Sequence, residues 1–320
     1  MSFLDRIREC QVFDPERYVP FVISDTVIGR IERGFLAQLR PYQDVLDVSD
    51  KGVRVNEALG TYDRITDAFA VVLSDLKDRG LVSGWRGEPY PVGVAYSEPA
   101  IFEMERAAVP LFGVRGYGVH VNGFVETEDG LHLWVAKRSL TKQTAPGKLD
   151  QIVAGGQPAG MTLTDNVIKE CAEEANIPES LAATAKPVGT VTYTTERPEG
   201  LRHDVLFNFD LALPSDFRPE NTDGEVESFE LWPIERVAQE IEETDRFKFN
   251  AALVNIDFLV RRGLIDADHR DYTEMACPHS RKSKGSARRW RPPVPPKGLR
   301  RSTRLPRHHR KSLPRCQVSA

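Results

Sequence analysis

Residues 155–177 read GGQPAGMTLTDNVIKECAEEANI, a glycine turn followed by residues with the spacing of an amphipathic helix. Glu170, Glu173 and Glu174 stand at i, i+3 and i+4 of that helix, which places three carboxylates on one face. Asn176 can adopt the left-handed conformation that ends a helix, and the proline two residues later prevents its continuation. The stretch therefore predicts a bounded helix with negative charge concentrated on one side.

A carboxylate cluster of this kind is useful where hard cations bind it, because like charges so close repel each other. Mg²⁺ and Mn²⁺ take oxygen ligands and share their other positions with water and substrate phosphates. Gly155 and Gly156 let backbone amides approach a ligand and lead into the N-terminus of the helix. Three glutamates alone are more often a solvated face, so the glycines at fixed spacing are what favour a catalytic unit.

The residues around this helix alternate between strand and helix patterns. Two runs of alternating apolar residues flank Asp129 and Gly130, a dipeptide typical of tight hairpin turns. Downstream, the apolar spacing predicts strands at 188–194 and 203–211 and helices at 234–243 and 249–262. Strands and helices mixed in this order predict an α+β or a layered α/β domain.

The first third of the chain has an apolar pattern of its own. Across 61–79 the apolar residues repeat at helical spacing and Gly80 follows as a stop, so we expect a long helix there. Glycines and prolines break 81–96 into short strands and turns, and we expect 101–108 to form another helix. Short strands and helices therefore mix in this part of the chain, and nothing catalytic stands out before about residue 115.

Charge is distributed unevenly along the 320 residues. The chain has 43 Lys and Arg against 47 Asp and Glu, but residues 276–320 hold 14 of the basic residues and no acidic one. Rich in proline and poor in large aliphatic residues, residues 275–320 cannot bury enough apolar surface to offset ordering entropy, so we expect disorder. A functionless tail, an out-of-frame reading of a GC-rich gene end, and an arm for nucleic acid all fit this composition. The acidic body disfavours nucleic acid.

Secretory and membrane classes are disfavoured by what the sequence lacks. The first residues have no uninterrupted apolar core of a signal peptide, and nowhere do 18 apolar residues run together. The cysteines have no spacing typical of zinc sites or disulfide frameworks, and we interpret them as free thiols: Cys10, Cys171, Cys277 and Cys316. We expect a soluble cytoplasmic protein with no membrane segment, and a homodimer is one option for its assembly.

The motif at 155–177 resembles the Nudix box, which runs G, five residues, E, seven residues, then R-E-U-x-E-E-x-G-U with U aliphatic. Aligning Gly155 with the first glycine places 169–177 on the final nine positions and leaves the three glutamates of the second half intact. Four positions depart from the pattern: Met161 replaces the first Glu, Lys169 the Arg, Cys171 the aliphatic residue and Asn176 the Gly.

A wider resemblance covers about residues 1–274. Segments such as GVHVNG at 118–123 and PGKLD at 146–150 look like a Nudix subfamily with an extra N-terminal domain, DUF4743-like. It is related to the thiamine pyrophosphokinase-associated Nudix proteins of fungi and the plastid Nudix hydrolases of plants. The resemblance implies a Nudix α/β/α sandwich at 116–274 preceded by a small α+β accessory domain at 1–115.

The same resemblance implies a metal-dependent hydrolase, using Mg²⁺ or Mn²⁺, that cleaves the diphosphate linkage of a small molecule. Thiamine diphosphate or its damaged analogues are the implied substrates, with oxidised guanine nucleotides of the 8-oxo-dGDP type as a second candidate. The implied metal ligands are Glu170, Glu173 and Glu174. Catalytic roles are expected for Glu173, Glu174, Lys169 and Glu227. The residues expected to bind substrate are Gly155, Gly156, Lys137, Arg138 and Lys148, and Lys142 is a further candidate for a phosphate.

Two other classes of function stay open at this point. A non-catalytic Nudix-fold module that binds or senses its ligand is suggested by the departures at Met161 and Asn176. A nucleic-acid protein acting through the basic tail would show affinity that falls steeply with salt and disappears on truncation after residue 275.

Overall fold

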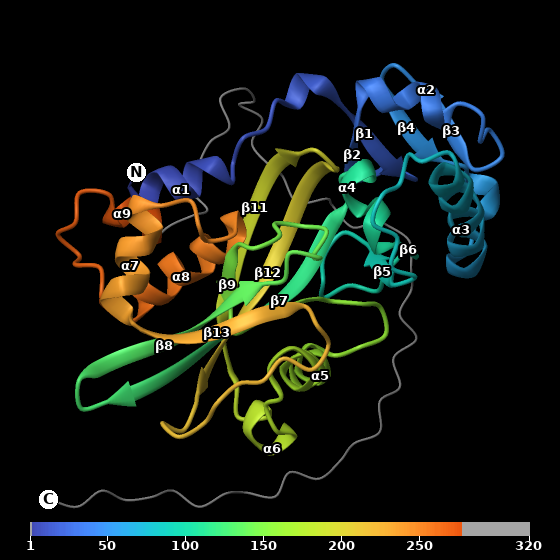
Figure 1. Ribbon diagram of the computed structural model, residues 1–320. Helices are drawn as coiled ribbons and strands as arrows, with labels where there is room; N and C mark the ends of the chain where they lie inside the picture. Colours follow the sequence, from blue (N-terminus) through green and yellow to red (C-terminus); the bar gives the residue numbers. More distant parts are fainter. Residues whose placement is uncertain (1, 277–320) are drawn as a thin grey trace, which may run out of the picture. The chain divides into compact units, whose positions relative to one another are not determined.

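The computed structural model describes residues 2–276, which belong to one compact unit (Figure 1). The sequence predicts disorder for 275–320, but Met275 and Ala276 are the last residues of a helix, α9 (Tyr272–Ala276); the rest of that segment, with Cys277 and Cys316, lies outside the described residues. No helix within 2–276 has the length and apolar character needed to cross a membrane. Cys10 and Cys171 are buried free thiols, as the sequence predicts.

The first part of the chain is built on a four-stranded sheet in the order β2-β1-β4-β3, with a separate β5-β6 pair. β1 pairs antiparallel with β2 and parallel with β4. The strands are β1 (Tyr18–Ile23), β2 (Thr26–Glu32), β3 (Leu46–Ser49), β4 (Gly52–Val55), β5 (Pro89–Val92) and β6 (Phe102–Glu105). The helices are α2 (Leu36–Leu39), α3 (Tyr62–Asp78) and α4 (Val109–Phe112).

α3 confirms the long helix expected at 61–79. Thr61 caps its N-terminus by accepting a hydrogen bond from the Arg64 amide, and Gly80 follows its end with φ of 73°. Phe69 is fully buried, and its ring centroid lies 4.5 Å from that of Phe102 in β6. Burying one such side chain contributes roughly 1.5–3 kcal/mol, so the stripe holds the helix on the accessory core.

The helix expected at 101–108 is not formed, and that prediction is wrong. β6 pairs with β5 instead, and only a 3₁₀ turn, Arg106–Ala108 (η4), follows it. Phe102 and Met104 are buried while Glu103 is partly exposed, which is the two-residue period of a strand. The segment is too short for its apolar spacing to distinguish the two periods.

The second part of the chain contains a seven-stranded sheet in the order β11-β12-β7-β8-β13, with β10 paired to β7 and β9 to β8. The predicted hairpin is formed by β7 and β8, and its two connecting residues are Glu128 and Asp129, one position earlier than predicted, because Gly130 already pairs with Thr127. The strands predicted at 188–194 and 203–211 lie within β11 and β12. The strands are β7 (Arg115–Thr127), β8 (Gly130–Arg138), β9 (Leu149–Gln151), β10 (Val153–Gly156), β11 (Lys186–Arg197), β12 (Gly200–Ala212) and β13 (Val226–Pro233).

Helices cover both faces of this sheet, so the predicted α/β/α sandwich is observed (Figure 1). Val119 and Val121 of β7 pack toward α5, whereas Phe124 belongs to the core beneath α8. The helices predicted from apolar spacing downstream of the sheet are α7 and α8. On one face lie α5 (Leu163–Ala175) and α6 (Glu179–Ala182), and on the other α7 (Ile234–Glu243), α8 (Phe249–Arg261) and α9 (Tyr272–Ala276).

The first helix, α1 (Phe3–Glu9), packs on the hydrolase-like part and not on the accessory sheet. Phe3, Ile7 and Cys10 are buried in the same core as α8, and the Arg6 guanidinium Nε donates to the Ile241 carbonyl at 2.9 Å. The sequence gives no sign of this, because the apolar face of a seven-residue helix fits any nearby core.

Candidate active site

The helix that the glycine turn leads into is α5, and its ends are set by side chains within the motif. Thr162 accepts hydrogen bonds at the N-terminus, and Asn176 ends the helix with φ of 52° in the left-handed region. The Ile177 amide then bonds to the Cys171 carbonyl at 2.9 Å. Asn176 therefore takes the conformation that the glycine of the Nudix box supplies, so this departure does not alter the backbone.

Two buried amide side chains fix the turn to α5. Asn166 Nδ2 donates to the Gly156 carbonyl at 2.7 Å and to Gln157 Oε1 at 3.0 Å. Gln157 Nε2 in turn donates to the Met161 carbonyl at 2.7 Å. Since the network uses the backbone of Met161, the loss of the Glu side chain at that position leaves the turn in place.

The sequence predicts Gly155 and Gly156 in a loop, but they are the last two residues of β10, and the chain turns after them at Ala159 and Gly160. We call residues 155–162 the glycine turn, and close contacts require glycine at its first two positions. A Cβ on Gly155 would lie 2.3 Å from Glu170 Cδ, and one on Gly156 would lie 1.5 Å from the Tyr90 hydroxyl. Both distances are far below van der Waals contact. Glycine at these positions lets α5 and the β5 strand approach the turn from two sides.

Replacing Gly155 by alanine is expected to lower turnover about a hundredfold, because the added methyl group displaces the Glu170 carboxylate by more than an ångström. The measurement is kcat/KM for a diphosphate substrate together with a thermal unfolding curve. Gly34→Ala is the matched control, since nothing lies within 4 Å of a Cβ there and its φ is not positive. Full activity of the Gly155 variant would show that Glu170 has no part in the reaction.

Glu174 is the most buried carboxylate of the motif, with 4% of its surface exposed. One oxygen accepts a hydrogen bond from the Ala154 amide at 2.8 Å, and the other lies 3.6 Å from Lys142 Nζ. Burial raises the pKa of Glu174 to about 7, and the Lys142 charge and the amide bond offset only part of that shift. The site therefore holds a carboxylate with too little positive charge around it.

Glu170 and Glu173 share a single cation of the protein. Lys169 Nζ lies 3.2 Å from Glu170 and 2.6 Å from Glu173, whose side chain is 48% exposed. Burial raises the pKa of Glu170, which is largely covered. The convergence of three glutamates that the sequence predicts is not observed. Within 2–276 no three acidic, His or Cys groups gather at metal-binding distance, and Glu174 contacts a different lysine from the one that Glu170 and Glu173 share.

Lys142, which the sequence suggests as a phosphate-binding residue, is instead buried between two carboxylates. Its side chain, only 9% exposed, lies between Glu174 of α5 and Glu225 of the loop before β13, and contacts both carboxylates. Burial lowers its pKa. The ammonium therefore joins the motif to the 221–225 loop as a buried counter-charge, which differs from the exposed phosphate-binding lysine that the sequence suggests.

The other residues expected to contact substrate are engaged by protein partners. Lys137 Nζ bonds to Glu227 at 2.8 Å on the exposed surface, so these two candidates contact each other. Within residues 2–276 neither of them forms a hydrogen bond or ion pair with a glutamate of α5. Lys148 Nζ bonds to Asp245 at 3.0 Å. Arg138 is buried and bonds to Asp150 at 2.9 Å, so it stabilises the following loop and does not reach a substrate.

Two residues near the turn could not be identified from the sequence. Tyr90 of β5 lies on Gly156, and Arg106 Cζ would lie 3.1 Å from a Cβ placed there. They lie far before the motif, in a part of the chain without catalytic spacing, so no local signal identifies them.

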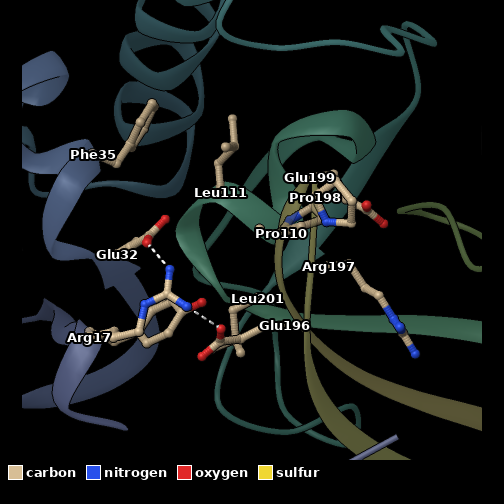
Figure 2. Close-up of a pocket in the computed structure, with 12 residues that line it drawn as sticks. Arg17, Glu32, Phe35, Pro110, Leu111, Glu196, Arg197, Pro198, Glu199 and Leu201 are labelled. Carbon is tan, nitrogen blue, oxygen red and sulfur yellow. Dashed lines mark hydrogen bonds and ion pairs between the residues drawn. The ribbon is translucent and has the colours of Figure 1, made fainter. Parts of the chain in front are cut away.

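A cavity of about 350 Å³ lies elsewhere, between the accessory part and the β11–β12 turn (Figure 2). Arg17 closes one side of it by pairing with Glu32 and with Glu196. Its lining includes Phe35 and Leu111 but no residue of 155–177, so it is separate from the candidate active site.

Comparison with known proteins matches two family models along the chain. The domain of unknown function DUF4743 matches residues 2–116, and the NUDIX domain matches residues 116–253. A solved NUDIX domain of NrtR from Shewanella oneidensis, in complex with ADP ribose, aligns with a TM-score of 0.37 and 16% identity, covering 48% of this chain and 91% of that one.

Two plant proteins are similar over most of the chain. Nudix hydrolase 24, chloroplastic, from Arabidopsis thaliana is 43% identical over 278 residues, which is 86% of this chain and 76% of the relative. Nudix hydrolase 20, chloroplastic, from the same plant is 42% identical over 285 residues with the same coverage. With the glycine turn, the glutamate helix and the sandwich fold in place, this chain belongs to the Nudix hydrolase family and is a hydrolase of pyrophosphate bonds.

Proposed function

We propose that the substrate is thiamine diphosphate or a damaged analogue of it, with oxidised guanine nucleotides of the 8-oxo-dGDP type as the second candidate. The observation that carries the hydrolytic site is the turn at Gly155, packed against Glu170 and followed by the buried Glu174. The choice of thiamine diphosphates rests on the resemblance to the thiamine-linked Nudix subfamily. It is supported by the accessory part at 2–116, which that subfamily also carries.

We propose that Glu170, Glu173 and Glu174 hold Mg²⁺ or Mn²⁺. The fit rests on chemistry: carboxylate oxygens suit hard divalent cations, and burial raises the pKa of Glu170 and of Glu174, so a bound cation would favour their charged forms. In the structure the ammonium groups of Lys142 and Lys169 contact these carboxylates. Each carboxylate therefore already lies beside positive charge, as it would beside a bound cation. When bound, the ion supplies charge that polarises the phosphorus–oxygen bond.

The chain's own groups then have separate roles in the proposal. Glu173 or Glu174 accepts the proton of the attacking water, and Lys169 orients the carboxylates it contacts. Glu227, which bonds to Lys137 and lies in β13 and not on the loop that the sequence suggests, is proposed as a further base or ligand. The backbone of Gly155 and Gly156 offers room for the substrate phosphates to approach.

The test is a substrate panel assayed with the full-length protein. Thiamine diphosphate, oxythiamine diphosphate and 8-oxo-dGDP are each incubated with Mg²⁺ or Mn²⁺, and phosphate release gives kcat/KM, with a chelated sample as the control. We expect the thiamine compounds to give the highest values and chelation to stop release. A higher value for 8-oxo-dGDP would overturn the substrate assignment. Tight binding in calorimetry without product would point to the non-catalytic sensor module.

Three further expectations stay proposals. They are a domain boundary near residue 115, a cytoplasmic location and a homodimer. The meeting of the two family matches at residue 116 supports the first.

A further inference from the structure

The accessory part places a positive charge directly on the glycine turn. Arg106 begins the 3₁₀ turn after β6, and its guanidinium carbon would lie 3.1 Å from a Cβ on Gly156. The same carbon lies 5.5 Å from the centroid of the Tyr90 ring, which itself covers Gly156. A residue 50 positions before the turn thus forms part of its surroundings.

The backbone around Arg106 is held firmly against the turn. The Ala159 amide donates to the Pro89 carbonyl at 2.9 Å, which ties the turn to β5. The buried carboxylate of Glu105 accepts hydrogen bonds from the amides of Arg86, Glu88 and Ala107 at 2.8–3.2 Å. Because these bonds fix the chain on both sides of Arg106, its side chain is positioned before any ligand arrives.

The Arg106 guanidinium retains donors that face water. Its side chain is 41% exposed, and within residues 2–276 it makes one hydrogen bond, from Nη1 to Glu88 Oε2 at 2.8 Å. A guanidinium carries five N–H groups in a planar fork that matches a phosphate. Several of these donors are therefore free for an anion at the turn.

A cation such as Arg106 offsets the negative charge of the motif. Three glutamates on α5 repel a diphosphate, and a cation beside the turn offsets part of that repulsion. The three basic residues that the sequence assigns to substrate are each bonded to a carboxylate: Lys137 to Glu227, Arg138 to Asp150 and Lys148 to Asp245. Arg106 differs from these residues because it lies beside the turn and has guanidinium donors that make no hydrogen bond within residues 2–276.

We propose that Arg106 binds a phosphate group of the diphosphate substrate, so that the accessory part supplies a substrate-binding residue to the hydrolase site. The assignment rests on the proposed function, since it takes the substrate to be a diphosphate held at Gly155 and Gly156. Glu88 acts as the group that positions the guanidinium and competes with the phosphate for it.

The experiment compares four variants of the full-length protein: Arg106→Gln, Arg106→Lys, Glu88→Gln and the matched control Arg40→Gln. Arg40 is an exposed arginine of the accessory part that pairs with Asp50 at 3.2 Å, far from the motif in sequence and in contacts. Calorimetry measures the Kd of methylenediphosphonate, a diphosphate analogue that cannot be hydrolysed, in the presence of Mg²⁺. Turnover of the best panel substrate separates KM from kcat, and thermal unfolding verifies the fold.

Arg106→Gln is expected to raise Kd and KM at least tenfold with a smaller effect on kcat, because a charge-assisted phosphate contact is lost. Arg106→Lys should give a Kd between those of Arg106→Gln and the unaltered protein, since lysine keeps the charge but lacks the planar fork of donors. Glu88→Gln should leave Kd unchanged or lower it, because the competing carboxylate is neutralised. Arg40→Gln should match the unaltered protein.

Two results would overturn the assignment. One is a Kd for Arg106→Gln within twofold of the unaltered protein. The other is a Glu88→Gln variant that weakens binding as much as Arg106→Gln, which would mean that the ion pair only supports the turn. Binding that depends on Arg106 in a protein that releases no phosphate from any panel substrate would reject the proposed hydrolysis and leave Arg106 assigned.

Discussion

The double variant Glu173→Gln, Glu174→Gln is expected to lose metal-dependent turnover by at least about a thousandfold, equivalent to about 4 kcal/mol of transition-state stabilisation. The exchange removes two negative charges that the proposed cation needs and leaves no carboxylate to accept a proton from water at these positions. Phosphate release with Mg²⁺ and Mn²⁺ measures the effect.

Glutamine is the right replacement because it preserves the contacts of the native side chains. At position 174 its amide oxygen can still accept the hydrogen bond from Ala154, and Lys142 keeps Glu225 as a partner. Glu173 is half exposed, so its exchange costs little stability. The unfolding midpoint should therefore stay close to that of the unaltered protein.

Glu179→Gln is the control for this pair, since it removes an exposed charge from the neighbouring helix α6. It should retain full activity. If the double variant kept more than a tenth of the original rate while folded, the glutamates of α5 would not be the catalytic centre.

Asp150→Asn is expected to lower the free energy of unfolding by about 3–5 kcal/mol, the usual cost of breaking a buried ion pair. Asp150 is 3% exposed, with Arg138 Nη1 at 2.9 Å and Lys248 Nζ at 3.2 Å. These two charges hold the pKa of Asp150 well below its usual range despite burial. The neutral amide leaves both cations buried without a counter-charge.

Urea unfolding at neutral pH measures this loss, with Asp245→Asn as the comparison. Asp245 pairs with Lys148 on the surface, where an ion pair contributes about 0–1 kcal/mol. A midpoint for Asp150→Asn that matches the Asp245 variant would show that the buried group of Arg138, Asp150 and Lys248 does not stabilise the fold.

The catalytic helix is the part of the molecule that sequence describes best. Its cap at Thr162, its end at Asn176 and the single face of its glutamates depend on residues within about 15 positions of each other. Local rules of capping and helical periodicity apply over such a range, so the helix and its boundaries follow directly. The β7–β8 hairpin is predictable for the same reason, to within one residue of its turn.

Pairing between distant segments is where sequence reasoning fails. Residues 101–108 have too few turns to distinguish a helix from a strand, and the choice was made by pairing with β5. Arg138, predicted to bind phosphate, is buried because Asp150 and two loop carbonyls surround it. A basic residue looks the same in sequence whether it faces a ligand or a buried carboxylate.

The sequence by itself determined the family motif, the helix α5 with its acidic face, and the strands and helices whose apolar spacing is regular, but not β9, β10 or β13. Only the tertiary structure decided which cation meets which carboxylate: Lys142 lies between Glu174 and Glu225, and Arg106 lies at the glycine turn. The physical reason is the separation along the chain over which each kind of interaction acts. Backbone preferences act over a few residues, whereas charge pairing and burial depend on distances that exist only after the two parts of the chain have folded together.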